Sequence, residues 1–101
     1  MNPKLRDEAT DRLFDVILDL RDREDCYAFF EDLCTVAELK ALSQRLEVAR
    51  MLSEKMTYAD ITLKTHASAA TISRVNRALL YGADGYRTAL DRIRDKENRD
   101  S

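Results

Sequence analysis

The hydrophobic residues of this chain recur at intervals of three and four positions. The clearest stripes are Leu13, Val16, Ile17 and Leu20; Leu39, Leu42, Leu46 and Ala49; and Ile72, Val75 and Leu79. This spacing puts side chains on one face of an α-helix, whereas the alternation typical of strands is hard to find. Pro3 is the only proline, and Gly82 and Gly85 are the only glycines, so the chain between them is free to be helical. The pattern predicts an all-α fold.

Capping signals divide the chain into six expected helices. Asn2 suits an N-cap and Pro3 suits the first position of a helix, so a first helix is expected to begin there. Phe14 and Leu18 fall outside its apolar stripe, and a helix that is apolar on two faces must be covered on both. A short second helix is expected over residues 25–33.

Two segments of the form hydroxyl-x-x-acid predict further helix starts. The capping box of Thr35 and Glu38 begins a third helix that runs to about Ser53, and Thr57 with Asp60 begins a brief fourth helix. Ser68 can cap a fifth helix, which the two glycines end, and a last helix is expected over residues 84–97. No internal repeat and no low-complexity linker divides the chain, so residues 1–101 are expected to form one domain.

The cysteines and the histidine add little chemistry. Cys26 and Cys34, if they share a helix, lie roughly 12 Å apart, which is too far for a disulfide. We therefore expect two small buried thiols. Two cysteines and a single histidine give no metal-ligand spacing, so neither a metal nor a cofactor is expected. No apolar run is long enough for a bilayer, and the first residues carry charge every few positions, so neither a signal peptide nor a membrane partner is expected. A cytoplasmic location is then the expectation.

Charge changes the picture more than composition does. The chain has a formal net charge of -2, yet residues 1–34 hold ten acidic and five basic residues, whereas residues 35–101 hold nine acidic and twelve basic ones. Residues 61–83 contain no carboxylate at all, and they include Lys64, Arg74 and Arg77. A surface that faces a nucleic-acid duplex must avoid carboxylates, because phosphates would repel them.

This carboxylate-free window contains most of a helix-turn-helix, expected over residues 57–80. Two short helices are joined by about three residues, and the second helix of such a motif enters the major groove of DNA. An α-helix with its side chains is 10–12 Å across, which matches a groove about 12 Å wide. The small residues Ser68, Ala69 and Ala70 at the start of this helix would let its backbone approach base edges closely. The sequence therefore predicts double-stranded DNA as the partner and association with the nucleoid.

The candidate DNA-binding residues fall into two groups. We expect base-edge contact from Ala69, Ala70 and Ser73, and contact with phosphates from Thr57, Lys64 and Arg77. The full set is Thr57, Tyr58, Lys64, Ser68, Ala69, Ala70, Thr71, Ser73, Arg74 and Arg77. For each polar member the alternative is plain solvent exposure, while Ile61, Ile72, Val75 and Leu79 are expected in the core.

The wider sequence resembles a known family. The stretch "ITLKTHASAATISRVNRAL" resembles the bacterial helix-turn-helix consensus, with His66 where that consensus usually has a turn glycine. Together, "TVAELKALSQRLEVARML", "MTYADI" and "ATISRVNRALLYG" are similar to the Trp repressor superfamily, and most of all to its YerC/YecD-type Trp-repressor-like regulators. This resemblance implies a six-helix fold and an intertwined homodimer, with residues 1–53 as the dimerisation helices. Such a dimer reads a pseudo-palindrome with recognition helices about 34 Å apart.

The resemblance also implies a possible effector pocket. In the Trp repressor two arginines enclose the indole ring of the co-repressor, and Arg45 and Arg74 match them, with Thr35 and Thr71 matching nearby threonines. Val75 stands where the family has glycine, and Ala78 stands where it has serine. Added carbons fill the space that the indole needs, so tryptophan is not expected as co-repressor, although another small molecule remains open. Alternatively, Arg45 and Arg74 pair with acids or phosphates and line no pocket.

Three classes of function compete at this stage. The favoured one is a sequence-specific transcriptional regulator, a repressor that binds its operator as a homodimer. The alternative is a helical protein-interaction module that retains the helix-turn-helix shape. An enzyme is not expected, because the chain has one histidine, no glycine-rich phosphate loop and no paired buried carboxylates. Asp60, His66 and Ser68 are explained more simply as caps and a turn.

Overall fold

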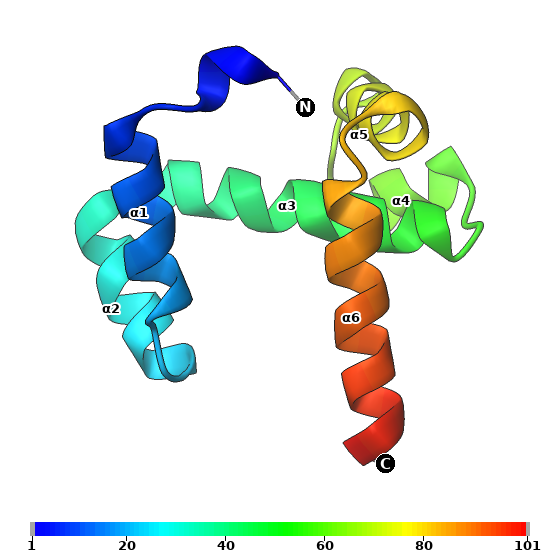
Figure 1. The fold of residues 1–101 in the computed structure, drawn as a ribbon. Coiled ribbons are helices and arrows are strands. Elements are labelled where there is room, and N and C mark those ends of the chain that lie inside the picture. Colours follow the sequence, from blue (N-terminus) through cyan, green and yellow to red (C-terminus); the bar gives the residue numbers. More distant parts are fainter. Residues whose placement is uncertain (1, 101) are drawn as a thin grey trace. The chain divides into compact units, whose positions relative to one another are not determined.

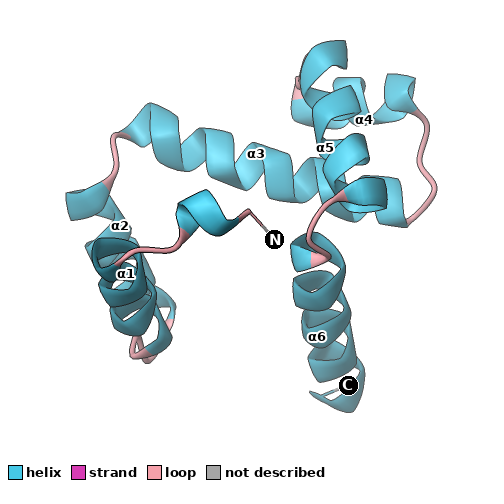
Figure 2. Cartoon of the chain, turned by 45° about the horizontal axis from the view of Figure 1, so that its top comes forward, coloured by secondary structure: helices cyan, strands magenta, loops and turns pink. Residues whose placement is uncertain are grey.

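The computed structural model describes residues 2–100, and these form six α-helices preceded by a single 3-10 turn. The α-helices are joined by short loops, and no strand occurs within the described range, so the all-α prediction is confirmed (Figures 1 and 2). In chain order the elements are η1 (Pro3–Leu5), α1 (Glu8–Leu18), α2 (Arg23–Leu33), α3 (Val36–Ser53), α4 (Tyr58–Thr65), α5 (Ala69–Tyr81) and α6 (Gly85–Asp100). None of these helices combines the length and the apolar character needed to cross a membrane.

The first predicted helix is two elements. Asn2 does cap a turn that has Pro3 at its first position, but this turn is a 3-10 helix that ends at Leu5. The backbone of Arg6 is extended, and α1 begins only after Asp7, whose Oδ1 accepts a hydrogen bond of 2.7 Å from the Thr10 N–H. An aspartate cap with two acidic residues in the following turn is a strong helix start, and it overrides the weaker signal at Asn2.

The predicted capping box at α3 is present in full. The Glu38 N–H donates to Thr35 Oγ1 at 3.1 Å, and the Thr35 N–H donates to Glu38 Oε1 at 2.9 Å. The bond from the backbone N–H of Thr35 holds the pKa of the Glu38 carboxyl below its ordinary value of 4.5, and the Thr35 side chain acts in the same direction. The charged form of Glu38 is therefore the form that stabilises the start of the helix.

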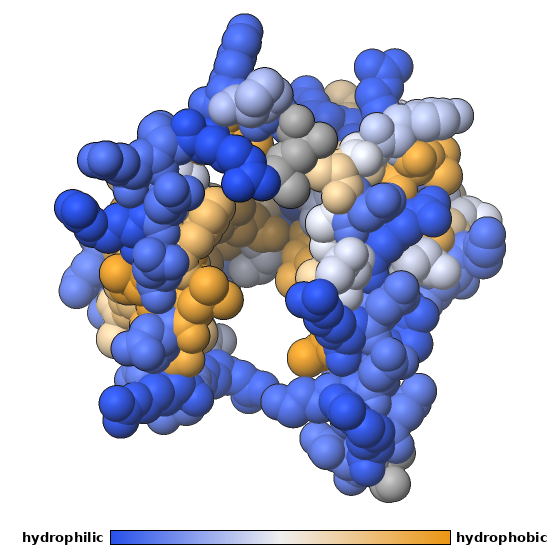
Figure 3. Space-filling model, viewed as in Figure 1, coloured by the Kyte–Doolittle hydropathy of each residue, from blue (hydrophilic) through white to orange (hydrophobic). Residues whose placement is uncertain are grey.

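The chain divides into two compact units, residues 1–40 and residues 41–101. In the first unit, neither α1 nor α2 contains a buried residue. Phe14 is 55% exposed and Leu18 is 82% exposed, while Leu13 and Ile17 are half-buried. Apolar surface accordingly shows between charged side chains over α1 (Figure 3). Helices that bury nothing within their own chain need another surface to cover them.

The cysteine prediction is wrong in one respect. Both thiols are free, as expected, but Cys26 is exposed and Cys34 is half-buried. The two residues do not share a helix, since α2 ends at Leu33 and Cys34 is the extended residue that caps it. The predicted burial of the two thiols is wrong because α2, which carries Cys26 and ends before Cys34, has no buried side chain in this chain.

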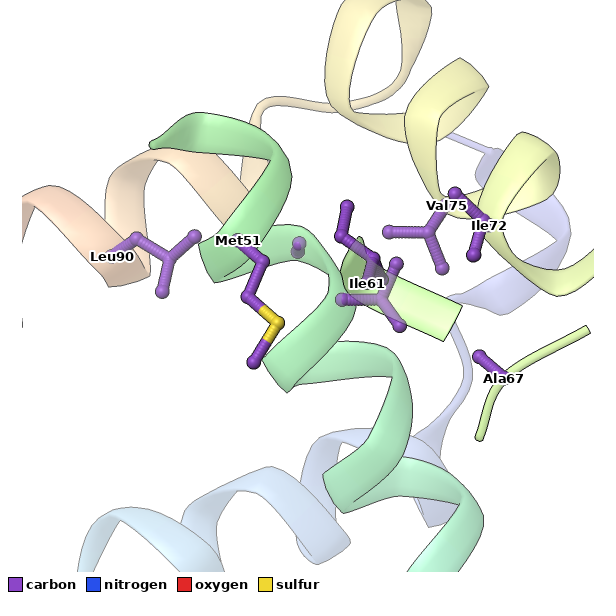
Figure 4. Close-up of a cluster of buried hydrophobic side chains, with 8 residues drawn as sticks. Met51, Ile61, Ala67, Ile72, Val75 and Leu90 are labelled. Atoms are coloured by element: carbon purple, nitrogen blue, oxygen red, sulfur yellow. The ribbon is translucent and has the colours of Figure 1, made fainter. Parts of the chain in front are cut away.

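The second unit contains the hydrophobic core. Val48, Ala49 and Met51 of α3 meet α4 through Ile61 and α5 through Ile72 and Val75, and Leu90 of α6 joins from the other side (Figure 4). Ile61, Ile72 and Val48 are completely buried. Of the predicted α3 stripe only Ala49 enters this core, because Leu42 and Leu46 are exposed. The buried face of α3 is thus displaced from the one that the leucine spacing indicated.

Two residues close the ends of α3 and α5 in different ways. Lys55 adopts a left-handed conformation with φ of 66°, and the N–H groups of Lys55 and Met56 donate to the carbonyls of Leu52 and Met51. This is a Schellman motif, in which glycine is the usual residue at the left-handed position.

At the end of α5, a Cβ on Gly82 would lie 2.4 Å from the carbonyl oxygen of Ala78. Glycine is therefore required at position 82.

Candidate nucleic-acid interface

The helix-turn-helix begins with α4, which is capped and anchored as the sequence predicted. Thr57 Oγ1 accepts a hydrogen bond from the Asp60 N–H, and Ile61 fixes the helix in the core. The helix ends at His66, whose φ of 61° is left-handed. Histidine therefore stands in the conformation that the consensus gives to glycine, which confirms its assignment as the turn residue.

The turn between α4 and α5 is held by side-chain bonds that the sequence did not reveal. The Thr65 hydroxyl donates to the Ile61 carbonyl at 2.7 Å and accepts from the Ala67 N–H at 3.2 Å. From α3, the Gln44 amide donates to the Thr65 carbonyl at 3.1 Å. The sequence pattern did not predict this role for Gln44, because its partner lies 21 residues away. The only available signal was that Gln44 is a polar residue on a helix next to the motif.

Helix α5, the second helix of the motif, starts at a closed cap. Ser68 Oγ accepts from the Thr71 N–H and also bonds the Thr71 hydroxyl, with both distances at 3.1 Å. These bonds engage the polar side-chain atoms of both residues within the protein. Ser68 therefore sets where the helix begins, and Thr71, which is half-buried, supports that cap.

The two faces of α5 are sharply different. Ile72, Val75 and Leu79 are buried, as predicted for core positions. Ala69, Ala70 and Ser73 are exposed, so the backbone of the first turn is covered only by two methyl groups and a hydroxymethyl group. A groove-binding helix needs such a face, because short side chains bring its axis close to the base edges.

The cations of the window have no acidic partner in the protein. Lys64, Arg74 and Arg77 are exposed, and none of them forms an ion pair within the described part of the chain. Arg50 of α3 shows the contrast, because its guanidinium bonds Glu47 at 2.7 Å and Glu54 at 3.1 Å. The pKa of Arg50 is raised above its ordinary value by these two carboxylates, and the hydrogen bond to Glu47 has the largest effect. The window therefore offers three positive charges that are available to an external anion.

The residues matched to a co-repressor site differ in their burial and in the contacts that they make. Val75 is 2% exposed and belongs to the core cluster with Ile61 and Ile72, so its side chain occupies packed space. Arg45 is half-buried and Arg74 is exposed. Thr35 is engaged in the capping box of α3, in the other unit of the chain.

Comparison with known proteins identifies the family. The family model described as Trp repressor protein matches residues 8–94, which is nearly the whole chain. The chain belongs to the Trp repressor family. YerC, an uncharacterized protein of Bacillus subtilis (strain 168), is 56% identical to this family member over 98 residues, which are 97% of this chain and 94% of YerC.

Two solved structures share the fold of this Trp repressor family member. A candidate Trp repressor from Staphylococcus aureus has a TM-score of 0.87 and 56% identity, covering 90% of this chain and 91% of its own. A TrpR-like protein from Eubacterium eligens ATCC 27750 has a TM-score of 0.88 and 55% identity, covering 91% and 95%. The six-helix Trp-repressor-like fold and the resemblance to YerC-type regulators are thereby confirmed, and the family is one of regulators rather than of enzymes.

Proposed function

We propose that this protein is a sequence-specific DNA-binding transcriptional repressor that acts as a homodimer on a pseudo-palindromic operator. The observation that carries this proposal is the exposed face of α5. It begins with Ala69, Ala70 and Ser73, and it lies in a window without carboxylates. The cations beside it form no ion pair with any described residue. Shape and charge on this face both suit a major groove lined by phosphates.

Roles within the interface follow from what each side chain already contacts. Ala69, Ala70 and Ser73 face bases, whereas Lys64, Arg74 and Arg77 bind phosphates and set the register of the protein on the duplex. Tyr58 and Thr57, at the start of α4, reach the DNA backbone. Ser68 and Thr71 act through the cap that positions α5, since their hydroxyls bond each other.

The homodimer is supported by the first unit of the chain. With no buried residue in α1 or α2, residues 1–40 lack a core of their own, and a unit of about 40 residues rarely folds without outside support. Burial of the apolar faces of α1 against a second copy supplies that support. Two-fold symmetry then gives two recognition helices and hence a palindromic site.

Tryptophan is not the effector in this proposal. This is supported by Val75, which stands where the family has glycine and adds buried carbons at that position. Isothermal titration of the protein with tryptophan should therefore give no heat of binding in the micromolar range, and a micromolar dissociation constant would contradict the assignment.

Selection of binding sites from random DNA tests the proposal directly. We expect enriched sequences with two inverted half-sites whose centres lie about one helical turn apart. The same selection with the triple variant Lys64→Ala, Arg74→Ala, Arg77→Ala should enrich nothing, because its phosphate contacts are gone. No enrichment with the unaltered protein, together with no retention on DNA-cellulose, would favour a protein-interaction module instead.

A further inference from the structure

A cavity of about 490 Å³ lies between the end of α3, the C-terminal half of α5 and α6. All of its lining residues belong to the second unit of the chain. It shares no residue with the DNA-binding set or with the positions matched to a co-repressor. Its volume is within the range of small-molecule sites, roughly 300–1,000 Å³.

The chemistry of this cavity is that of an amphipathic anion site. Leu52, Leu79 and Leu90 supply apolar surface. Its charged residues are three cations and one acid, namely Lys55, Arg87, Arg94 and Asp91. The cavity therefore carries an excess of positive charge in a chain whose net charge is -2.

Several hydrogen-bond donors of the cavity remain available. Arg87 Nε donates to the Leu79 carbonyl at 3.0 Å, and among the described residues its two Nη groups have no acceptor. In the described part of the chain, the side chains of Lys55 and Asn76 have no polar partner. Arg94 meets Asp91 only at 3.5 Å, in an exposed pair that contributes little.

One cation of the cavity, Lys55, stands at a backbone position that glycine usually occupies. Lys55 occupies the left-handed position of the Schellman motif with φ of 66°, and its side chain lines the cavity. The turn after α3 thus brings one lysine, and α6 brings two arginines, around an apolar surface to which α3, α5 and α6 contribute leucines. A carboxylate or phosphate group attached to an apolar body can bind the cations with its charge and the leucines with its apolar part.

We propose that this cavity binds a small organic anion, a carboxylate or a phosphate monoester with an apolar body, and that the bound anion strengthens DNA binding. The first part is independent of the proposed function and the second part rests on it. Asn76, Leu79 and Leu80 belong to the recognition helix, so a ligand held by Lys55 and Arg87 links that helix to α3 and α6. A ligand that binds the DNA-competent arrangement of these helices better than any other arrangement shifts the protein toward that state.

The test of binding uses the full chain without DNA. Phenyl phosphate, phenylacetate, phenylacetamide and inorganic phosphate are titrated separately into ¹⁵N-labelled protein, and amide shifts are followed by NMR. We expect saturable shifts at Lys55, Asn76, Leu80 and Arg87 with at least one of the two aromatic anions, and the stronger of the two identifies the headgroup. The neutral amide and inorganic phosphate should each bind at least about tenfold more weakly.

Variants separate this site from general charge effects. Lys55→Gly should lower the affinity for the aromatic anion about tenfold, while the folded state is retained because glycine suits the left-handed backbone. Arg94→Gln should have an effect of the same size, and Arg92→Gln, an exposed cation of α6 outside the cavity, should have none. Equal binding by all three variants, or shifts spread over other surfaces, would overturn the site.

The regulatory part is measured afterwards on a selected operator. Saturating aromatic anion should tighten operator binding by about fivefold or more in the unaltered protein and leave Lys55→Gly unchanged. An unchanged operator affinity in the unaltered protein would overturn the regulatory part while the site itself stands. Failure of DNA binding altogether would instead overturn the proposed function and leave the NMR result intact.

Discussion

At the scale of single residues, the helix-turn-helix depends on a few backbone positions with unusual demands. His66 and Lys55 are left-handed although neither is glycine, and Gly82 packs against the carbonyl of Ala78. His66 could be predicted because the helix-turn-helix pattern has a fixed turn position. Lys55 could not, because nothing in "SEKM" marks a left-handed residue. Such positions depend on how neighbouring helices approach each other, and single-sequence patterns do not report that.

Gly82→Ala tests the closest of these approaches. The added Cβ would lie 2.4 Å from backbone oxygen, which cannot move aside as a flexible side chain would. We expect the free energy of unfolding to fall by about 1–3 kcal/mol, as measured by urea denaturation. Gly85→Ala is the matched control, since a Cβ there meets nothing within 4 Å. That variant should be neutral or more stable by up to about 1 kcal/mol, and equal losses in both variants would show that the contact at Gly82 is unimportant.

Arg77→Ala and Ser73→Ala distinguish phosphate contact from base contact. Loss of Arg77 should weaken binding to every DNA sequence and reduce the slope of log K against log salt by about one unit. Loss of Ser73 should instead change the preferred bases and leave the salt slope as it is. Gel-shift titrations at several salt concentrations measure both, with Arg92→Ala as a control on α6. Identical behaviour of all three variants would contradict the groove assignment.

At the scale of helices, local capping determined where most elements begin. The starts of α3, α4 and α5 were predicted correctly, because their caps are complete within four residues of sequence. The start of the first helix was misplaced, because Asn2 and Asp7 both offer a cap and each of them caps an element of its own. Competition between nearby caps is settled by the geometry of the turn that follows, here an extended Arg6.

The capping box of α3 should make stability depend on acid pH. Because the bonds to Thr35 lower the pKa of Glu38 in the folded state, its contribution is complete above the ordinary value of 4.5 and is lost as pH falls through the lower folded value. Glu38→Gln should therefore be less stable than the unaltered protein at pH 7, and the difference should shrink below pH 4.5. Thermal unfolding between pH 7 and pH 3 measures this, with Glu97→Gln on α6 as control. A difference that is constant over this range would rule out a charged cap.

At the scale of the whole molecule, burial was the least predictable property. Ile61, Ile72, Val75 and Leu79 are buried as their spacing indicated, because their partners lie within a compact helical unit. Leu42 and Leu46 have equally regular spacing and are exposed. Periodicity shows which face of a helix is apolar, but it cannot tell whether the covering surface comes from the same chain or from another one.

Phe14→Lys tests whether a second chain covers the apolar surface of α1. If Phe14 is buried in a homodimer, a lysine there should weaken self-association about tenfold or more, since burial of a large apolar side chain is worth about 1.5–3 kcal/mol. Leu63→Lys is the matched control, because Leu63 is an exposed leucine of the other unit. Sedimentation equilibrium gives the association constants. A monomeric unaltered protein, or equal effects of the two substitutions, would count against dimerisation through α1.

The small number of cations assigned to the DNA-facing surface, Lys64, Arg74 and Arg77, affects how such a regulator would search a chromosome. Three cations in each protomer make six in a dimer, so the salt slope for random DNA could reach only about -5. Residence on unrelated sequence should then be brief, and the protein would reach its operator mainly by diffusion through solvent rather than by sliding along the duplex.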